Sequence, residues 1–293
     1  MFTQLFGNYL LKKGIVNKQQ LTEAIRISAE SHIKIGSLAI HCGYMTPEQV
    51  ERVYICQTHE DLLFGQIAIR EGYINEEQLD EILREQTPSY LKIGQTLVEQ
   101  GVITRNEFDV LVHEYQTENE ISSLDSVTEQ MASFQKMIST FCSYTTITEN
   151  TKLVSYLHLL FNNLIRFIGA DFTPLNMVPI HEHFTTCASS QEITGRIPIQ
   201  IAIDMESETG IHFASRYAGE DFIEFDEYCQ ASLDDFLNLH NGLFLVNMSN
   251  MHDIELGLNP PLPVCNAKYV PDGDSYFLPV IFTFGIVNFI FTI

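Results

Sequence analysis

Glycines recur at a fixed interval of 29 residues in the first third of the chain. The first glycine of each unit lies at Gly7, Gly36, Gly65 and Gly94. A second glycine follows seven residues later in every unit, at Gly14, Gly43, Gly72 and Gly101. The same spacing persists in an apolar position of each unit, at Leu21, Val50, Leu79 and Phe108. Such a period predicts repeated supersecondary units that cover one another's apolar faces.

Each unit has the pattern of a helical hairpin. A short segment such as GSLAIHC ends at the second glycine, which suits the left-handed position after a helix. An Asn or Thr then precedes a Gln or Glu by three residues, and this spacing predicts a capping box that opens a second helix. The pairs are Asn17 with Gln20, Thr46 with Gln49, Asn75 with Gln78, and Thr104 with Glu107. Residues 1–116 are therefore predicted to be an all-α domain of four 29-residue hairpins.

These units resemble the MshEN-type domain at the N-terminus of type II secretion and pilus assembly ATPases. The family motif has 24 residues, begins with RLG and closes with Gln; the segment from Lys34 to Gln57 has this length. The resemblance implies a cyclic di-GMP site with these candidate residues: Lys34, Gly36, Gly43, Lys92 and Gly94. The motif arginine is replaced by Leu5, Lys34, Leu63 and Lys92, which do not reproduce bidentate, stacked recognition. A helical platform that docks a secretion or motility protein is the alternative.

The length of the chain and the uneven distribution of its charge both indicate two domains. Its 293 residues favour two cores, and the net charge of −22 excludes a nucleic acid polymer as partner. Residues 1–116 carry a balance of −6 and residues 117–293 a balance of −16. The polar, acidic start of residues 117–150 followed by Met131, Phe134, Met137 and Phe141 predicts a helical linker.

Cysteine usage and hydropathy bear on location. Six cysteines without a CxxC pair indicate reduced thiols, and no basic segment followed by an apolar one opens the chain, so we expect a cytoplasmic protein. Residues 276–293 lack charges and approach the length of a spanning helix. Pro279 and Gly285 favour two strands instead, with Val287, Phe289, Phe291 and Ile293 on one face. We therefore expect no membrane association.

An amphipathic helix is predicted over residues 227–250. Apolar residues recur at three- and four-residue spacing, at Leu233, Phe236, Leu237, Leu243 and Phe244. Asp235, Asn238 and Gly242 share another face, because they are separated by three and four residues. A carboxylate, a carboxamide and a residue without a side chain form a surface that a partner's backbone could approach closely.

Pro260 follows Asn238 after 21 residues, and this spacing carries a second resemblance. Residues 151–293 resemble the CheX and CheC chemotaxis phosphatases, whose motif reads acid or Ser, three residues, Glu, two residues, Asn, about 21 residues, Pro. The corresponding positions here are Ala231, Asp235, Asn238 and Pro260. The resemblance implies an α+β domain with helices packed on an antiparallel sheet, and a homodimer.

The resemblance also implies a reaction. Asn238 would orient the water that hydrolyses the aspartyl phosphate of a response regulator, and Asp235 would pair with the regulator's Lys. Gly242 would allow close approach, and Pro260 would shape the adjoining loop. The regulator brings its own magnesium, so no intrinsic cofactor or metal is expected.

Two functions stay open because Asp235 replaces Glu, which shortens the reach by about 1.5 Å. Misplacement on the order of 1 Å can cost roughly a hundredfold in rate. The chain is either a phosphatase, regulated through the repeats, or a non-catalytic signalling adaptor. In the adaptor, the CheX-like domain dimerises or holds a response regulator, and the repeats dock a protein or cyclic di-GMP.

The remaining pattern predicts the order of elements in the second domain. Strands are expected at 176–187, 195–205, 253–258, 262–270, 276–284 and 286–293, and helices at 151–169, 208–217 and 227–250. His181 and His183 share one strand face, which is the start of a metal site but more typical of a surface strand. His240 lies on the side of its helix away from Asp235 and is expected to be structural.

Overall fold

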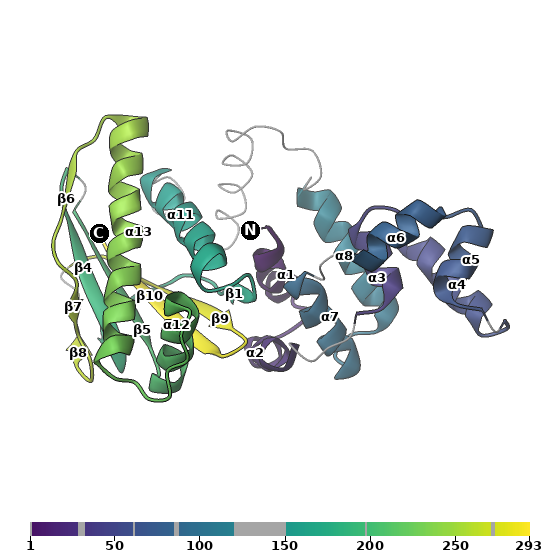
Figure 1. Ribbon diagram of the computed structural model, residues 1–293, viewed down its shortest axis with the longest axis horizontal. Coiled ribbons are helices and arrows are strands. Elements are labelled where there is room, and N and C mark those ends of the chain that lie inside the picture. The colour runs from purple at the N-terminus through teal and green to yellow at the C-terminus, as the bar shows by residue number, and fades with distance from the viewer. Residues whose placement is uncertain are drawn as a thin grey trace. The chain divides into compact units, whose positions relative to one another are not determined.

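The chain forms two compact units, shown as a computed structural model in Figure 1. The described residues are 2–28, 33–60, 62–84, 88–119, 151–196, 198–270 and 273–293. The first unit is helical; its described residues are Phe2 and those from Tyr9 to Asn119. The second contains everything described from Thr151 onward, and Thr3–Asn8 also belong to it.

Short helices make up the first part of the chain. They are η1 (Phe2–Leu5), α1 (Phe6–Lys12), α2 (Lys18–Ile27), α3 (Ile35–His41), α4 (Pro47–Gln57), α5 (Phe64–Arg70), α6 (Glu76–Arg84), α7 (Ser89–Glu99) and α8 (Arg105–Asn119). The expected linker helix of 117–150 begins inside α8, and its apolar residues Met131 to Phe141 lie outside the described residues.

The local turn chemistry predicted for this part is confirmed. Four glycines adopt the left-handed conformation with φ between 70° and 73°: Gly14, Gly43, Gly72 and Gly101. Reciprocal capping bonds form at all four predicted boxes; Asn17 Oδ1, for example, accepts from the Gln20 amide at 2.9 Å while Gln20 Oε1 accepts from the Asn17 amide at 2.9 Å. These residues fix where each second helix begins.

The first glycine of a pair is required by helix packing. A Cβ atom on Gly36 would lie 2.7 Å from Val50, and one on Gly65 would lie 2.7 Å from Leu79. On Gly94 it would lie only 2.0 Å from the Phe108 ring, which is fully buried. At these three positions, glycine therefore allows the second helix of the pair to pack against the first at close range.

In the residues described from Thr151 onward, the second unit combines three helices with an antiparallel sheet. Its elements are α11 (Thr151–Phe167), β1 (Phe172–Pro174), β2 (Val178–Ile180), β3 (His183–Phe184), β4 (Cys187–Gly195), β5 (Ile199–Met205), α12 (Ser207–Ala218), α13 (Glu227–His252), β6 (Leu256–Leu258), β7 (Leu262–Pro263), β8 (Lys268–Tyr269), β9 (Ser275–Phe282) and β10 (Gly285–Thr292). The main sheet has the order β1-β9-β10-β5-β4-β6, with β2 on β9 and β7 on β4. The helical part followed by an α+β unit agrees with the predicted fold class.

The uncharged C-terminal segment forms the hairpin of β9 and β10. Gly285 has a φ of 148° and pairs with Phe282 across the turn. Val287, Phe289 and Phe291 are buried on one face, as the alternation predicts, whereas Ile293 follows the strand and is 43% exposed. Among the described residues, no helix is long and apolar enough to cross a membrane.

Two predicted strands are shorter and more divided than expected. The segment 176–187 contains β2 and β3, which join different sheets, and β3 pairs with β8 instead of extending β2. The segment 262–270 contains β7 and β8 with a turn between them, where Asn266 has a φ of 52°. A left-handed residue cannot continue a strand, so the single strand expected there was wrong.

The helix α13 lies across the sheet over β4, with α12 beside it and α11 also in contact (Figure 1). It begins at Asp226, whose Oδ1 accepts from the backbone amides of Tyr228 and Cys229 at 3.0 Å. Its buried side chains include Leu233, Phe236, Phe244 and Met248. One face of α13 is thus anchored in the core, which leaves the opposite face for the solvent.

Candidate functional site

The outward face of α13 and the loop after β6 line one open groove. From α13 come Ala231, Asp234, Asp235 and Asn238, and from the loop region come Leu258, Asn259, Pro260 and Pro261. Asp235, Asn238 and Pro260 are all exposed. Three of the four predicted site residues of this unit therefore meet at the groove.

Asn238 is held by a residue that sequence reasoning missed. Its Oδ1 accepts a hydrogen bond of 2.8 Å from Nε2 of Gln191, on β4 beneath the helix. Gln191 is only 2% exposed. A buried carboxamide in a strand is the signal that could have drawn attention to it, because buried polar groups need hydrogen-bond partners.

Asp235 already has a partner within the chain. Its Oδ2 accepts a hydrogen bond of 2.7 Å from the hydroxyl of Tyr217, on α12. Burial and this hydrogen bond to the Asp235 carboxylate raise the pKa of the Tyr217 hydroxyl. The carboxylate is therefore oriented before any partner arrives, by an aromatic residue that the sequence analysis did not single out.

Gly242 lies one turn beyond Asn238 and is partly exposed. A Cβ atom at this position would meet nothing within 4 Å. In the middle of a helix, alanine is more favourable than glycine by about 1 kcal/mol, and the packing around Gly242 would not exclude alanine. The position thus offers open space above the helix backbone.

The structure shows the surroundings of the histidines that the sequence analysis singled out. His240 is fully buried, its Nδ1 lies 2.9 Å from Nδ2 of Asn163, and burial lowers its pKa to about 3. His183 directs Nε2 to Asp204 Oδ2 at 2.7 Å, whereas His181 is exposed. Within the described ranges, no group of three or more His, Cys, Asp or Glu residues is arranged to hold a metal ion.

The five candidate nucleotide residues occupy different environments in the helical unit. Lys34 is exposed at the start of α3, and Lys92 is partly buried in α7. Gly36 and Gly94 are buried beneath the helices that follow them, and Gly43 forms an exposed turn. A groove in this unit is lined by other residues, namely His41, Cys42, Tyr44, Glu81 and Arg84.

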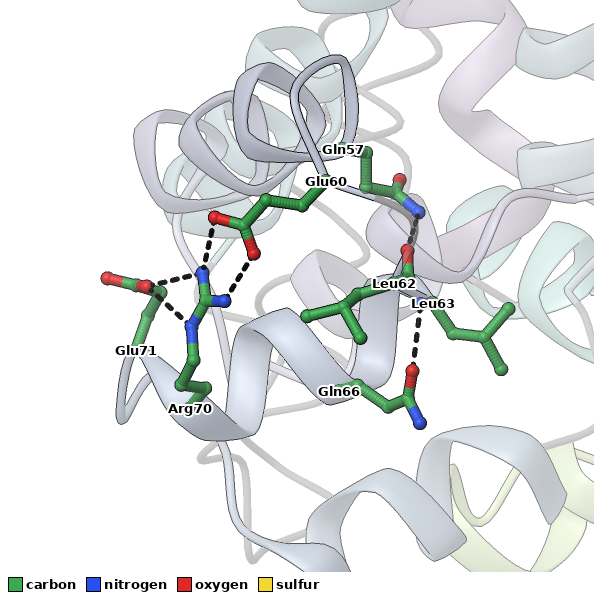
Figure 2. A network of polar contacts seen from close by, with 7 residues as sticks. All are labelled: Gln57, Glu60, Leu62, Leu63, Gln66, Arg70 and Glu71. Atoms are coloured by element: carbon green, nitrogen blue, oxygen red, sulfur yellow. Dashed lines mark hydrogen bonds and ion pairs between the residues drawn. The ribbon is translucent and has the colours of Figure 1, made fainter.

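Figure 2 shows the junction of α4 and α5, where the sequence resemblance leads us to expect the end of one motif copy and the start of the next. Gln57, the closing residue of the motif, donates from Nε2 to the Leu62 carbonyl at 3.1 Å. Leu63, at the arginine position of the next copy, is 72% exposed. Arg70, the last residue of α5, is engaged by carboxylates, with 3.2 Å to Glu60 Oε1 and 3.0 Å to Glu71 Oε1. An exposed apolar side chain thus precedes α5, and a paired guanidinium lies at the other end of this helix.

No protein-family model matches the chain, and no curated protein matches its sequence. Solved structures resemble part of it. A CheC-like superfamily protein from Shewanella sp. PV-4 is 15% identical, with 48% of this chain and 95% of that one covered and a TM-score of 0.43. CheX from Desulfovibrio desulfuricans is 14% identical over 46% of this chain and 94% of that one, with a TM-score of 0.40. A CheX–CheY complex with BeF3 and magnesium from Borrelia burgdorferi is 16% identical over 47% of this chain and 94% of that one, with a TM-score of 0.39.

Proposed function

We propose that the second unit is a phosphatase for the aspartyl phosphate of a response regulator. The observation that carries this proposal is the groove in which Asn238 and Asp235 stand one helical turn apart, exposed, beside the loop of Pro260. Their spacing is the one by which the sequence resembles the CheX and CheC motif.

The charge of the groove restricts the substrate class. Among the described residues that line it, none is Lys or Arg, and two are aspartates, Asp234 and Asp235. A free phosphomonoester would be repelled, because nothing in the groove neutralises its charge. A phosphoryl group that arrives with its own cations avoids this penalty. A response regulator provides them, since a magnesium ion and a Lys lie beside its phosphorylated aspartate.

The reaction needs little from the chain beyond positioning. Water attacks the phosphorus in line, the bond between phosphorus and the aspartyl oxygen breaks, and inorganic phosphate and a free carboxylate result. Asn238 orients the water, and Asp235 pairs with the regulator's Lys. The open space at Gly242 lets the regulator approach the helix backbone.

The proposal is tested by following the phosphorylated form of several response regulators, charged with acetyl phosphate, with and without the full chain. Faster loss of the phosphoryl group from at least one regulator is the expected result. If a regulator binds the chain but its phosphate decays at the intrinsic rate, the unit is a signalling adaptor and the enzymatic proposal fails.

Lengthening the acidic residue of the groove is expected to raise activity. Asp235→Glu extends the carboxylate by about 1.5 Å toward a docked Lys, and we expect a roughly tenfold faster hydrolysis. Tyr217→Phe is the matched control, because it releases Asp235 from its 2.7 Å hydrogen bond without adding reach. Equal rates for Asp235→Glu and the native chain would show that this carboxylate does not set the register.

We further propose that the helices of the first unit are four hairpins, related by 29 residues, that dock a protein. Their glycines at Gly36 and Gly94 are accounted for by packing, and Leu63 and Arg70 offer no free guanidinium to a phosphate. Calorimetry of the full chain with cyclic di-GMP is expected to give no binding heat at high micromolar ligand. A saturable heat signal that is lost in Lys34→Ala with Lys92→Ala would assign the unit to nucleotide binding instead.

A further inference from the structure

A chain of buried polar side chains runs from the core to Asn238. The hydroxyl of Tyr156 on α11 donates to Asn241 Oδ1 at 2.6 Å, and Asn241 Nδ2 donates to Gln191 Oε1 at 2.8 Å. Gln191 Nε2 then donates to Asn238 Oδ1 at 2.8 Å and to the Asn259 carbonyl at 2.8 Å. Tyr156, Asn241 and Gln191 are each at most 2% exposed.

One backbone atom, the Asn259 carbonyl oxygen, sets the direction of every hydrogen bond in this series of side chains. The Asn259 carbonyl can only accept, so the Gln191 atom that faces it must be the amide nitrogen. That same nitrogen faces Asn238, which must therefore turn its oxygen inward. The other end of Gln191 is then an acceptor, and it selects the nitrogen of Asn241. The polarity of the Asn238 carboxamide is thus fixed from within the protein.

We propose that Gln191 is a positioning residue that makes Asn238 present its amide NH2, a hydrogen-bond donor, to the phosphoryl group. This inference rests on the proposed phosphatase function and specifies how its site works. Asn238 is exposed, and in the described residues its Nδ2 has no hydrogen-bond partner. Its oxygen accepts from Gln191 on the inner side, which leaves the NH2 as the end of the carboxamide that faces the groove.

The donor polarity fits the chemistry of the substrate. An N–H group stabilises a phosphoryl oxygen or holds one lone pair of the water while the other attacks phosphorus. Because Gln191 Nε2 also bonds the Asn259 carbonyl, the same residue ties the loop of Pro260 to α13. Asn259 is held further by Glu192, because its backbone N–H donates to the Glu192 carbonyl at 3.0 Å. Helix and loop are therefore set as one surface before the regulator docks.

Gln191→Glu tests the proposal with a side chain of nearly the same size. At a pH above the pKa of the new carboxyl group, the carboxylate cannot donate to Asn238 Oδ1 or to the Asn259 carbonyl, so Asn238 is expected to turn and direct its NH2 inward. We expect kcat to fall at least about tenfold while KM changes less than about threefold. Gln200→Glu is the matched control, because Gln200 lies on the adjacent strand, is partly buried and bonds Ser190 instead. Its kcat and KM should stay at native values.

A second readout does not depend on activity. Hydrogen exchange of side-chain amides, followed by NMR on the native full chain, should show the Gln191 NH2 exchanging at least about tenfold more slowly than the Asn238 NH2, because only the former is buried and bonded. A protected Asn238 NH2 in the native protein would overturn the proposal. In Gln191→Glu, protection should move to the Asn238 NH2.

The two measurements separate the failure of this inference from that of the proposed function. If the native chain accelerates hydrolysis and Gln191→Glu does so equally well, the positioning role is refuted while the phosphatase stands. If the native chain is inactive, the proposed function fails, and the positioning role in catalysis falls with it. The exchange data still decide the polarity of Asn238 in that case.

Discussion

Replacing Asn238 by alanine is expected to lower the rate of aspartyl-phosphate hydrolysis about a hundredfold, the loss typical when a water is no longer held in line. The side chain is exposed and its only hydrogen bond in the described structure is to Gln191, so stability should change by no more than about 0.5 kcal/mol. Single-turnover decay of a phosphorylated response regulator, with the chain in excess, measures the effect directly. Binding of the regulator should be nearly unchanged, because Asp235 and the loop remain.

Asn250→Ala provides the matched control for this substitution. Asn250 lies on the same helix, is also exposed and is three turns from Asn238. It should leave the rate at the native value. Asn238→Asp should be at least as damaging as alanine, because it puts a negative charge next to the phosphoryl group. Equal rates for the Asn238→Ala and Asn250→Ala chains would remove the catalytic assignment and leave an adaptor.

The sequence predicted best those features that are encoded within a few residues. The capping pairs, such as Asn17 with Gln20, and the left-handed glycines, such as Gly43, depend only on local geometry. The face shared by Asp235 and Asn238 follows from helical period alone. Each of these could be read without knowing the fold.

The features that were missed depend on residues far apart in the sequence. Gln191 is 47 residues before Asn238, and Tyr217 is 18 residues before Asp235. Both meet their partners only after α13 packs over β4 and beside α12. No spacing rule applies to such pairs, and a single Gln in a strand does not indicate which helix will cover it.

The prediction of a single strand over residues 262–270 was wrong for a related reason. Its apolar residues fit a strand, but Asn266 adopts a φ of 52° and turns the chain, so β8 pairs with β3 in a separate two-stranded sheet. Asn tolerates this conformation better than most residues, which is visible in sequence only as a weak preference. Tertiary pairing decided the outcome.

Gly94→Ala is expected to destabilise the helical unit by about 2 kcal/mol. The added Cβ would lie 2.0 Å from Phe108 Cε2 and 2.5 Å from Cζ, and this ring is fully buried. Overpacking of this kind costs roughly 1 to 3 kcal/mol or more, and the better helix propensity of alanine offsets about 1 kcal/mol. Amide hydrogen exchange in α7 and α8 of the full chain should accelerate about 30-fold, the equivalent of this free energy.

Gly242→Ala is the matched control, because it also changes a glycine inside an α-helix but meets nothing within 4 Å. It should stabilise α13 by about 0.5 to 1 kcal/mol and slow exchange there about twofold to fivefold. Adding Phe108→Leu to Gly94→Ala should recover part of the lost stability, since the smaller side chain clears the new methyl group. Unchanged exchange in Gly94→Ala would mean that the Phe108 ring moves aside freely. Packing would then not explain why glycine occupies position 94, and close approach by a ligand would be the better explanation.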